Sequence, residues 1–463
     1  MLRPLGKSEQ LSAVSHELGF FKNVGVSAHY TLEEVATSPD LRCVIYAALA
    51  DVVRKHDILS AIPVDEASPH AYFARLPTID LGSCVFFKTR SKSVEQGEGD
   101  SELDALLQEQ HNIDFKSHHG TVPFWRLTVL RDAEVECSFT ASFIFHHSLG
   151  DGATGTIFHT FFWQSLNTNV SLPSFLEQSN SLVKVPGSTE LLPPLEELHP
   201  LPLNPNPSAH QTQSLKEWTG NSIQLPLESL YRSIYFSPTS STKFAQRCKE
   251  NGLTVTSGLV AVMAGAMFDA LPPTIDALTG IVPINLRPWL NLPPHIANGA
   301  MGSFIDATKV QIRRSHYEVD VQATIHGLPA ARHTADEIKR YLTRNLSPSG
   351  EPYTSVAAFK AIPDIAAVFK SMVGTNRDAA FEISNLGRFP VDGQTKAEAQ
   401  WRIGRMAFSR SALAFGAALT TSVISGADGA LTIGFSWQEC VVDNAFVNSV
   451  IRGFGEGFDS DGF

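Results

Sequence analysis

The sequence predicts a mixed α/β fold with two lobes, and three observations lead to this prediction. The chain has 463 residues, which is more than one hydrophobic core usually organises. Both halves mix helical periodicity with strand alternation, and each half contains a hairpin. A Pro-rich stretch separates the two halves. We therefore expect a first lobe at 1–165, a crossover linker at 166–224 and a second lobe at 225–463, with largely antiparallel sheets.

Helices and one hairpin account for the first half of the chain. Apolar residues recur at helical spacing in three segments: 8–22, 41–55 and 103–113. Two strands at 125–130 and 137–145 then form a hairpin around a polar turn at 131–134. The second strand alternates with period two, which is typical of a strand in a sheet. A helix follows, which begins at Gly152 and ends near Leu166.

The composition changes between residues 165 and 214, where eight of the 27 prolines lie. The densest part is Leu-Leu-Pro-Pro-Leu-Glu-Glu-Leu-His-Pro-Leu-Pro at 191–202. Pro-rich segments are extended and do not build a core. We therefore expect this stretch to be a linker or a crossover between the lobes.

A buried helix and several strands account for the second half. Thr254 or Thr256 is expected to cap a helix through 259–268, which is apolar nearly all round and should be buried on several sides. The acidic, Gly-rich end at 455–463 is expected to be frayed. Five strands are expected, the last two as a hairpin: 278–284, 380–385, 403–409, 418–425 and 430–437.

Composition narrows the classes of partner and compartment. The formal net charge is -11, which disfavours nucleic acid and anionic membrane surfaces because like charges repel. The five cysteines are scattered and have no C-x-x-C spacing, so neither a disulfide scaffold nor a cysteine zinc site is predicted. No window approaches the ~18 apolar residues of a membrane span, and no apolar signal core follows the N-terminus. We expect a cytoplasmic protein.

The segment from Phe143 to Gly152, Phe-Ile-Phe-His-His-Ser-Leu-Gly-Asp-Gly, is the most informative part of the sequence. A buried strand ends there in two adjacent histidines, and a Gly-flanked turn leads into a helix. Strand ends are rigid, so a side chain at that place is held firmly while its tip reaches a cleft. Imidazole is the side chain best suited to exchange protons near neutral pH. The segment therefore indicates acid–base chemistry.

This segment is also open to other interpretations. In one alternative, the two histidines are core residues whose hydrogen bonds are satisfied within the protein. In another, Asp151 serves only as a helix N-cap. Two histidines and one aspartate suggest a metal, but no further histidine or carboxylate lies nearby in the sequence, so no metal site is predicted. The stretch from Gly150 to Gly155 also fits G-x-G-x-x-G. Histidines intervene between strand and glycines, however, and Asp151 would repel a pyrophosphate, so dinucleotide binding is not expected.

The sequence from His146 to Gly152 resembles the HHxxxDG motif of the coenzyme A-dependent acyltransferase superfamily, which includes chloramphenicol acetyltransferase, plant BAHD enzymes and the condensation domains of peptide synthetases. The chain is most similar to fungal alcohol O-acetyltransferases. The similarity covers most of the chain and rests on these further segments: 2–6, 16–20, 123–128, 192–198, 248–254, 283–287, 384–387 and 418–437. The Asp-Phe-Gly-Trp-Gly motif of the plant relatives is absent from the sequence, which tells against a plant-type enzyme.

The resemblance implies two chloramphenicol-acetyltransferase-like lobes with a tunnel between them, in which donor and acceptor meet from opposite faces. It implies that His147, the second histidine, is the general base. It also implies that Asp151 holds the motif by pairing with an arginine, for which Arg287 is the best candidate. His146 and Gly152 are then expected to support the motif.

The remaining site candidates rest on weaker arguments. Ser384 and Asn385 end a strand of the second lobe, and Thr421 and Ser422 lie in the hairpin, so all four are candidates for oxyanion or substrate contacts. Asn385 alternatively only shapes a turn. Thr254 and Ser257 are candidate CoA contacts. Four further histidines are expected to be surface or packing residues: His111, His118, His119 and His159.

The sequence thus predicts an acyl-CoA-dependent O-acyltransferase, with acetyl-CoA as the first candidate co-substrate and a small apolar alcohol, such as a secondary metabolite, as acceptor. No bound cofactor, no metal and no covalent intermediate are expected. A monomer suffices, because the site lies between lobes of one chain. Three alternatives stay open: an amine acceptor, a thioester on a separate carrier protein, and a non-catalytic binding protein of the same fold.

Overall fold

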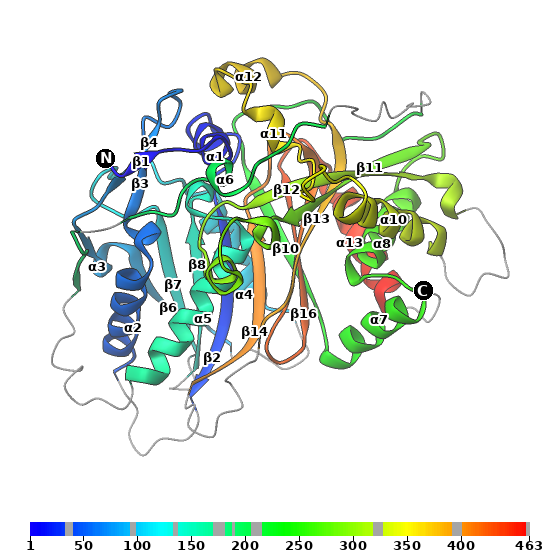
Figure 1. Ribbon diagram of the computed structural model, residues 1–463. Coiled ribbons are helices and arrows are strands. Elements are labelled where there is room, and N and C mark those ends of the chain that lie inside the picture. Colours follow the sequence, from blue (N-terminus) through cyan, green and yellow to red (C-terminus); the bar gives the residue numbers. More distant parts are fainter. Residues whose placement is uncertain are drawn as a thin grey trace.

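The computed structural model describes residues 1–32, 40–92, 99–132, 138–169, 181–187, 190–204, 215–317, 327–390 and 401–459. Two large sheets stand side by side, and helices cover their outer faces (Figure 1). The tip of the hairpin predicted at 131–134 falls partly outside the described residues, as do parts of the Pro-rich stretch.

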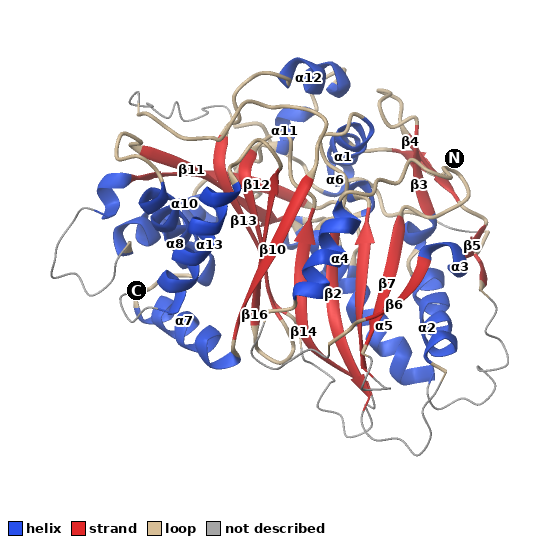
Figure 2. Cartoon of the chain, turned by 180° about the vertical axis from the view of Figure 1, so that it is seen from behind, coloured by secondary structure: helices blue, strands red, loops and turns tan. Residues whose placement is uncertain are grey.

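The first sheet carries the motif on its central strand, β8. Its order is β14-β2-β8-β7-β6, and only the β6–β7 pair is parallel. Helices α2 and α5 lie on one face and α4 on the other (Figures 1 and 2). The strands are β2 (Val24–Leu32), β6 (Val85–Thr89), β7 (Trp125–Arg131), β8 (Ser138–Phe145) and β14 (Trp401–Arg410). The helices are α1 (Lys7–Glu17), α2 (Leu41–Lys55), α4 (Ser101–His111) and α5 (Gly152–Asn169).

Burial on both faces explains the composition of β8. All eight of its residues are buried. The ring of Phe143 stacks on Phe158 of α5, with ring centroids 3.8 Å apart. Ser142, on the opposite side, receives a hydrogen bond from Ser27 of β2 at 3.0 Å. A strand packed this tightly gives the residues that follow it a fixed starting point.

The second sheet has the order β10-β16-β15-β13-β11-β12. Strand β13 runs parallel to both of its neighbours, and the other pairs are antiparallel. Its strands are β10 (Ser229–Phe236), β11 (Ala277–Asn285), β12 (Ile305–Arg313), β13 (Ala379–Arg388), β15 (Ala417–Ser425) and β16 (Leu431–Gln438). Its helices gather on the face away from the first lobe (Figure 1): α7 (Pro238–Glu250), α8 (Val255–Ala270), α10 (Leu328–Thr343) and α13 (Asn444–Asp459).

Shorter elements complete the molecule. A three-stranded sheet has the order β1-β4-β3, and a two-stranded sheet joins β5 to β9. These strands are β1 (Arg3–Pro4), β3 (Ala61–Val64), β4 (Tyr72–Arg75), β5 (Thr78–Asp80) and β9 (Leu182–Lys184). The short helices are α3 (Leu81–Cys84), α6 (Leu195–Leu198), α9 (Pro294–Gly299), α11 (Val356–Phe359) and α12 (Ile365–Met372). Single 3₁₀ turns occur at Asp57–Ser60, His147–Leu149, Arg287–Trp289 and Arg314–Tyr317.

The second half of the chain contributes one strand, β14, to the sheet of the first half. β14 comes late in the chain, yet it pairs along its length with β2 of the first sheet. It also packs against β16 of the second sheet, where the hydroxyl of Ser436 donates to the carbonyl of Arg410 at 2.7 Å. The strand predicted at 403–409 is therefore present, but it joins the sheet of the other half. The division of the chain at 1–165, 166–224 and 225–463 stays a prediction.

Two predictions about weakly ordered segments were wrong. Leucines of the Pro-rich stretch do build a core, because Leu195, Leu198 and Leu201 are buried in one cluster with Leu286 and Leu290. The C-terminal end is helical through residue 459 instead of frayed from 455. Phe458 is fully buried there, and its ring stacks on Phe236 with centroids 3.8 Å apart.

Helix ends follow local signals where these are strong. Asp40 caps α2 by accepting from the backbone of Arg42 and Cys43. α1 ends at Glu17 instead of near residue 22, because Gly19 follows with a φ of 77°, which does not continue a helix. Within the described residues no single helix is long and apolar enough to cross a membrane; α7 and α8 together pass that test by length and composition alone, with a 101° bend between them.

Candidate active site

The two motif histidines lie in different surroundings at the end of β8. The backbone N–H of His146 donates to the carbonyl of Phe124 at 2.9 Å, which closes the strand. A 3₁₀ turn then leads to α5. His146 is fully buried, whereas His147 keeps part of its surface exposed. The ring of His147 meets the edge of Phe21, with ring centroids 5.6 Å apart.

The surroundings of His147 favour the neutral imidazole. Burial lowers its pKa below the ordinary 6.5, while its own backbone carbonyl and the charge of Asp151 work in the opposite direction. Nδ1 is buried and has no partner on another residue. A neutral imidazole is the protonation state that a general base requires.

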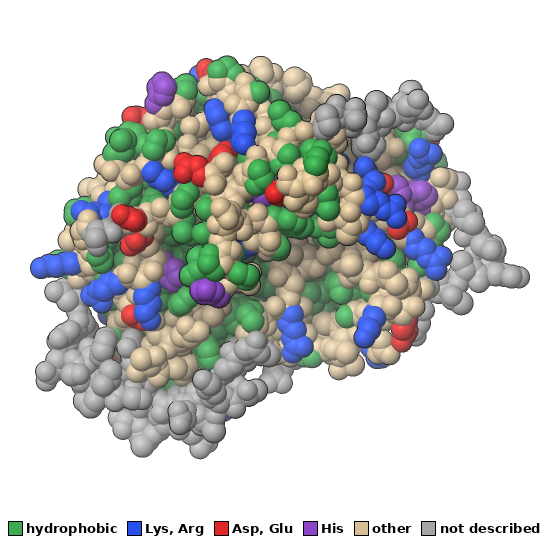
Figure 3. Space-filling model, viewed as in Figure 1, with side chains coloured by type: hydrophobic (Ala, Val, Ile, Leu, Met, Phe, Trp, Pro, Cys, Tyr) green, Lys and Arg blue, Asp and Glu red, His purple; other side chains and the backbone are tan. Residues whose placement is uncertain are grey.

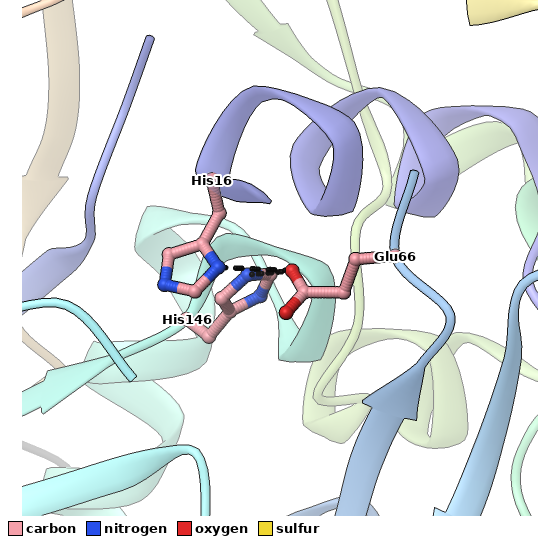
Figure 4. Close-up of side chains that lie close together, drawn as sticks. All are labelled: His16, Glu66 and His146. Atoms are coloured by element: carbon pink, nitrogen blue, oxygen red, sulfur yellow. Dashed lines mark hydrogen bonds and ion pairs between the residues drawn. The ribbon is translucent and has the colours of Figure 1, made fainter. Parts of the chain in front are cut away.

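His146 belongs to a buried network of three side chains (Figure 4). Oε2 of Glu66 lies 2.9 Å from Nδ1 of His16 and 3.1 Å from Nε2 of His146. Burial and the neighbouring His16 lower the pKa of His146 to about 4. Burial acts against ionisation of Glu66, but the two histidines hold its pKa at about 2. The network therefore contains the carboxylate of Glu66 beside a neutral His146.

Backbone donors fix the tautomers of both imidazoles. The N–H of Ser148 donates to Nδ1 of His146 at 3.0 Å, and the N–H of Phe115 donates to Nε2 of His16 at 3.1 Å. Each ring must therefore be protonated on the nitrogen that faces Glu66. These protons make Glu66 the acceptor of two hydrogen bonds.

The same geometry bears on the metal question. No further histidine or carboxylate was expected near the motif, and this expectation was wrong: His16, Glu66 and His146 bring their ligand atoms within 4.8 Å of one another. A metal binds the lone pair of a neutral imidazole nitrogen. Here the nitrogens that face the carboxylate carry protons, so the donor set fits a hydrogen-bonded network and not a metal centre.

Asp151 pairs with Arg287, as the sequence predicts. Oδ2 accepts from Nη1 of Arg287 at 2.7 Å, and Oδ1 accepts from Nη2 at 3.0 Å. Oδ2 also accepts from the backbone of Phe304 at 3.0 Å, and Oδ1 from that of Thr154 at 3.3 Å. Asp151 thus caps the start of α5 as well as bridging the lobes. Since both oxygens are committed, it is not placed to transfer protons.

Gly152 lies where both lobes press on the start of α5. A Cβ atom at this position would lie 2.8 Å from Cδ2 of Leu386 and 2.9 Å from Cζ of Phe408. Leu386 comes from β13 of the second sheet, and Phe408 comes from β14, the late strand that joins the first sheet. The motif requires glycine here because no side chain fits between these two.

The four candidates of the second lobe divide into two pairs. On β13, Ser384 alternates with Asn385, and the next residue on the Ser384 face, Leu386, contacts Gly152. Ser384 therefore faces the motif. Ser422 lies beside it in register on β15, and its hydroxyl is buried without a hydrogen-bond partner. Strand alternation and register thus place Ser384 and Ser422 on the sheet face that meets the motif.

Asn385 and Thr421 lie on the other face of the sheet. The amide of Asn385 donates to the hydroxyl of Thr256 on α8 at 3.2 Å, and its carbonyl oxygen accepts from the backbone of Gly387 at 2.8 Å. Thr421 alternates with Ser422 and so points the same way as Asn385. These two side chains are not brought to the motif, which favours the interpretation of Asn385 as a turn residue.

Thr254 and Ser257 form the N-terminal cap of α8. The hydroxyl of Thr254 accepts from the backbone of Ser257 at 3.1 Å, and the hydroxyl of Ser257 accepts from the backbone of Thr254 at 3.1 Å. This is the reciprocal arrangement of a capping box. The predicted cap at Thr254 is confirmed, and a contact with CoA stays a prediction.

The four histidines without a spacing argument behave as predicted. His111 and His159 are fully buried. Nδ1 of His111 lies 2.5 Å from Oδ1 of Asn23, while its Nε2 has no partner, and Nε2 of His159 lies 2.9 Å from the carbonyl oxygen of Val26. His118 and His119 are exposed. None of them joins the motif.

Two cavities open on the described part of the molecule, and the first is lined by Gly302 and Phe304, whose backbones bond to Asp151 of the motif. One of about 320 Å³ opens between the lobes, with Phe161 and Phe304 among its lining residues. The other, of about 610 Å³, borders β12 and α10, where basic side chains gather on the right of Figure 3. His147 lines neither cavity, so the predicted tunnel stays a prediction.

Two α/β lobes, with a strand-end HHxxxDG motif whose aspartate is locked by an arginine, define an acyltransferase. The chain belongs to the alcohol acetyltransferase family, whose family model matches residues 4–448. It is 47% identical over 459 residues to "Probable alcohol acetyltransferase crmB" of Aspergillus fumigatus, covering 98% of each chain. The predicted family and enzyme class are confirmed, and this family uses CoA-linked acyl donors.

Solved structures agree with the fold. The TRI3 trichothecene 15-O-acetyltransferase of Fusarium sporotrichioides superposes with a TM-score of 0.73 at 16% identity, covering 98% of this chain and 94% of that one. TRI101 of F. sporotrichioides, solved with coenzyme A and T-2, gives a TM-score of 0.56 at 10% identity, covering 97% and 96%. The predicted mixed α/β architecture with mixed and antiparallel sheets is confirmed.

Proposed function

We propose that the protein transfers an acyl group, acetyl as the first candidate, from acyl-CoA to the hydroxyl of a small apolar acceptor, with His147 as general base. One observation carries this proposal: His147 is the motif imidazole that is partly exposed and favoured in its neutral form. His146, by contrast, has both ring nitrogens occupied. Only the second histidine is therefore available to a substrate.

The proposed reaction needs no covalent intermediate. Nε2 of His147 takes the acceptor's hydroxyl proton as the oxygen attacks the thioester carbonyl. The carbonyl oxygen becomes an oxyanion, for which we propose the hydroxyls of Ser384 and Ser422 as donors. When the carbon–sulfur bond breaks, the imidazolium returns the proton to the thiolate. The products are the ester and free CoA.

The remaining motif residues would hold this geometry. Asp151 and Arg287 fix the turn against the second lobe, His146 anchors it to Glu66, and Gly152 lets both lobes approach. Thr254 and Ser257 stay candidate CoA contacts at the N-terminus of α8. These residues act on the rate through the position of His147.

The relatives guide the choice of acceptor. TRI3 is a trichothecene 15-O-acetyltransferase, and TRI101 was solved with T-2 and coenzyme A. We therefore propose a hydroxylated, largely apolar secondary metabolite as the acceptor. The cysteines within the described residues are free thiols, which supports a reducing, cytoplasmic location.

An acceptor screen tests the proposal. Purified protein is mixed with acetyl-CoA and a panel of hydroxylated acceptors, thiol release is followed with a thiol reagent, and products are identified by mass. His147→Ala should lower the rate by roughly 10²–10⁴. The exposed His119→Ala serves as the matched control and should be unchanged. Near-full activity in folded His147→Ala overturns the assignment.

The same assay separates the alternatives. Thiol release in a burst without acceptor, equal to the amount of enzyme, would indicate an acyl-enzyme. Turnover only with an amine, or only with a carrier-protein thioester, would replace the alcohol or the CoA in the proposal. Absence of turnover with every donor and acceptor would favour a binding protein.

A further inference from the structure

A buried ion pair joins the two sheets next to the motif. Nη1 of Arg410, on β14, donates to Oε1 of Glu382, on β13, and Nη2 donates to the carbonyl of Thr421 at 3.3 Å. Arg410 and Glu382 are 8% and 7% exposed. Nε of Arg410 is buried and has no hydrogen-bond partner. The pair therefore lies within the contact between the lobes and is not fully satisfied there.

Strand register places Arg410 beside the motif. Arg410 pairs with Val24, and Val24 pairs with Phe145, so the three lie in one row across the first sheet. His147 follows Phe145 by two residues. Phe408, two residues before Arg410 on the same strand face, packs on Gly152 at the other end of the motif turn. The turn from His147 to Gly152 thus runs over the strand end that carries Arg410.

β13 spans the motif from the other side. Glu382, Ser384 and Leu386 share one face of this strand. Leu386 contacts Gly152, and Glu382 binds Arg410. Ser384, the proposed oxyanion donor, lies between these two fixed points. The ion pair and the Leu386 contact therefore both hold this wall of the site against the first lobe.

Stability alone does not account for such a pair. Removing two charges from water costs free energy that their attraction only partly returns, so a buried ion pair is weak support for stability. Among the described residues, the charges that act on His147 are Asp151 at the start of α5, Arg410 on β14 and Glu382 on β13. Asp151 is neutralised by Arg287. Arg410 and Glu382 act on His147 with opposite signs.

We propose that Glu382 and Arg410 are positioning residues, which hold the Ser384 wall of the site against the motif. This inference rests on the proposed role of His147 as general base. Loss of the Glu382 anion makes the imidazolium harder to form, and loss of the Arg410 cation makes it easier. Each residue thus has its own signature in the pH profile.

The pH dependence of kcat/KM tests the inference. Its acidic limb reports the pKa of the base in the free enzyme. Glu382→Gln keeps shape and hydrogen bonding but removes the charge, so the limb should move to lower pH. Arg410→Met should move it to higher pH, and Arg410→Lys should leave it in place. We expect shifts on the order of half a pH unit, below the roughly one to three units of a directly adjacent charge.

Two controls complete the design. The variant Glu382→Gln/Arg410→Met removes both charges and should return the limb near its original position. Asp100→Asn disturbs another buried pair, between Arg90 and Asp100. Arg90 also bonds to Thr140 near the start of β8, so this pair lies far from the motif at the other end of the strand. Asp100→Asn should leave the limb unchanged. A merely structural role would lower rates in all these variants without opposite shifts.

The outcomes separate this inference from the proposed function. An unshifted limb in Glu382→Gln, or a shift to higher pH, overturns the inference, even if Arg410→Met does not fold. Opposite shifts in the two single variants support it. If His147→Ala keeps full activity, the proposed function fails first, and a shifted limb then reports some other base. If His147→Ala abolishes activity but the acidic limb does not move in the Glu382 and Arg410 variants, only the role of the ion pair is refuted.

Discussion

Replacing Glu66 by leucine tests whether the buried network positions the motif. In the native protein Oε2 of Glu66 accepts from His16 at 2.9 Å and from His146 at 3.1 Å. Leucine offers no acceptor, and the backbone donors on the far sides of both rings prevent a change of tautomer. Two buried N–H groups then lose their partner, at about 1–3 kcal/mol each. We expect Glu66→Leu to lower the free energy of unfolding by about 2–6 kcal/mol.

Glutamine is the matched control for this change. Its carbonyl oxygen can occupy the Oε2 position and keep both hydrogen bonds without the charge. Neutral hydrogen bonds are worth about 0.5–1.5 kcal/mol and charged ones about 1.5–3, so Glu66→Gln should lose about 1–3 kcal/mol in all. The expected order of stability is therefore native, then Gln, then Leu.

Urea unfolding and steady-state kinetics measure these effects together. Midpoints are compared at unchanged slope, which keeps the comparison valid for a chain with two lobes. kcat should fall in the same order as stability, with KM little changed, because the network touches His146 and not the substrate. Equal stability of the Gln and Leu variants would refute the hydrogen-bond argument. A chelator that lowers the native midpoint would show that the cluster holds a metal.

Three further predictions concern the motif and its surroundings. Asp151→Ala leaves the charge of Arg287 buried without its ion-pair partner and should lower the free energy of unfolding in urea by about 3–5 kcal/mol. Adding Arg287→Met should recover much of this loss, and a double variant as unstable as Asp151→Ala would contradict the prediction. Gly152→Ala forces a Cβ atom against Leu386 and should cost about 1–3 kcal/mol and lower kcat, whereas a native thermal midpoint and rate would show that the site gives way. Stability should fall on acidification from pH 6.5 to 4, at about 1.4 kcal/mol per pH unit for each histidine held neutral, because the unfolded chain binds protons there that the folded chain does not. A flat stability profile in that range would contradict the pKa values of the three fully buried histidines at about 3 or 4: His111, His146 and His159.

Local signals in the sequence were sufficient for elements with clear ends. The helix expected at 41–55 has these bounds in the structure, because Asp40 caps it and its apolar spacing is regular. The Phe-rich strand before the motif and the 418–437 hairpin are also confirmed. The pairing of Asp151 with Arg287 followed from the family resemblance, since no local pattern links residues 136 positions apart.

Long-range geometry was beyond the reach of these signals. His16 and Glu66 lie 130 and 80 residues before His146, and nothing in the spacing indicates that they meet it. The face on which Asn385 lies depends on which side of β13 meets the first lobe, which only the packed structure decides. The signal that existed was His16, which falls inside a segment similar to the family's start but was not given a role.

The crossing of β14 has a mechanical consequence. β14 lies among the strands of the second sheet in the chain, but its backbone hydrogen bonds join it to the first sheet, so it fastens the two sheets together. A hinge motion that separates the two sheets would have to break the backbone hydrogen bonds between β14 and β2. Substrates are therefore expected to enter and leave by side-chain and loop movements, without separation of the two sheets. The first half of the chain, produced alone, would lack β14 and so carry an incomplete sheet, whereas every strand of the second sheet lies within 225–463.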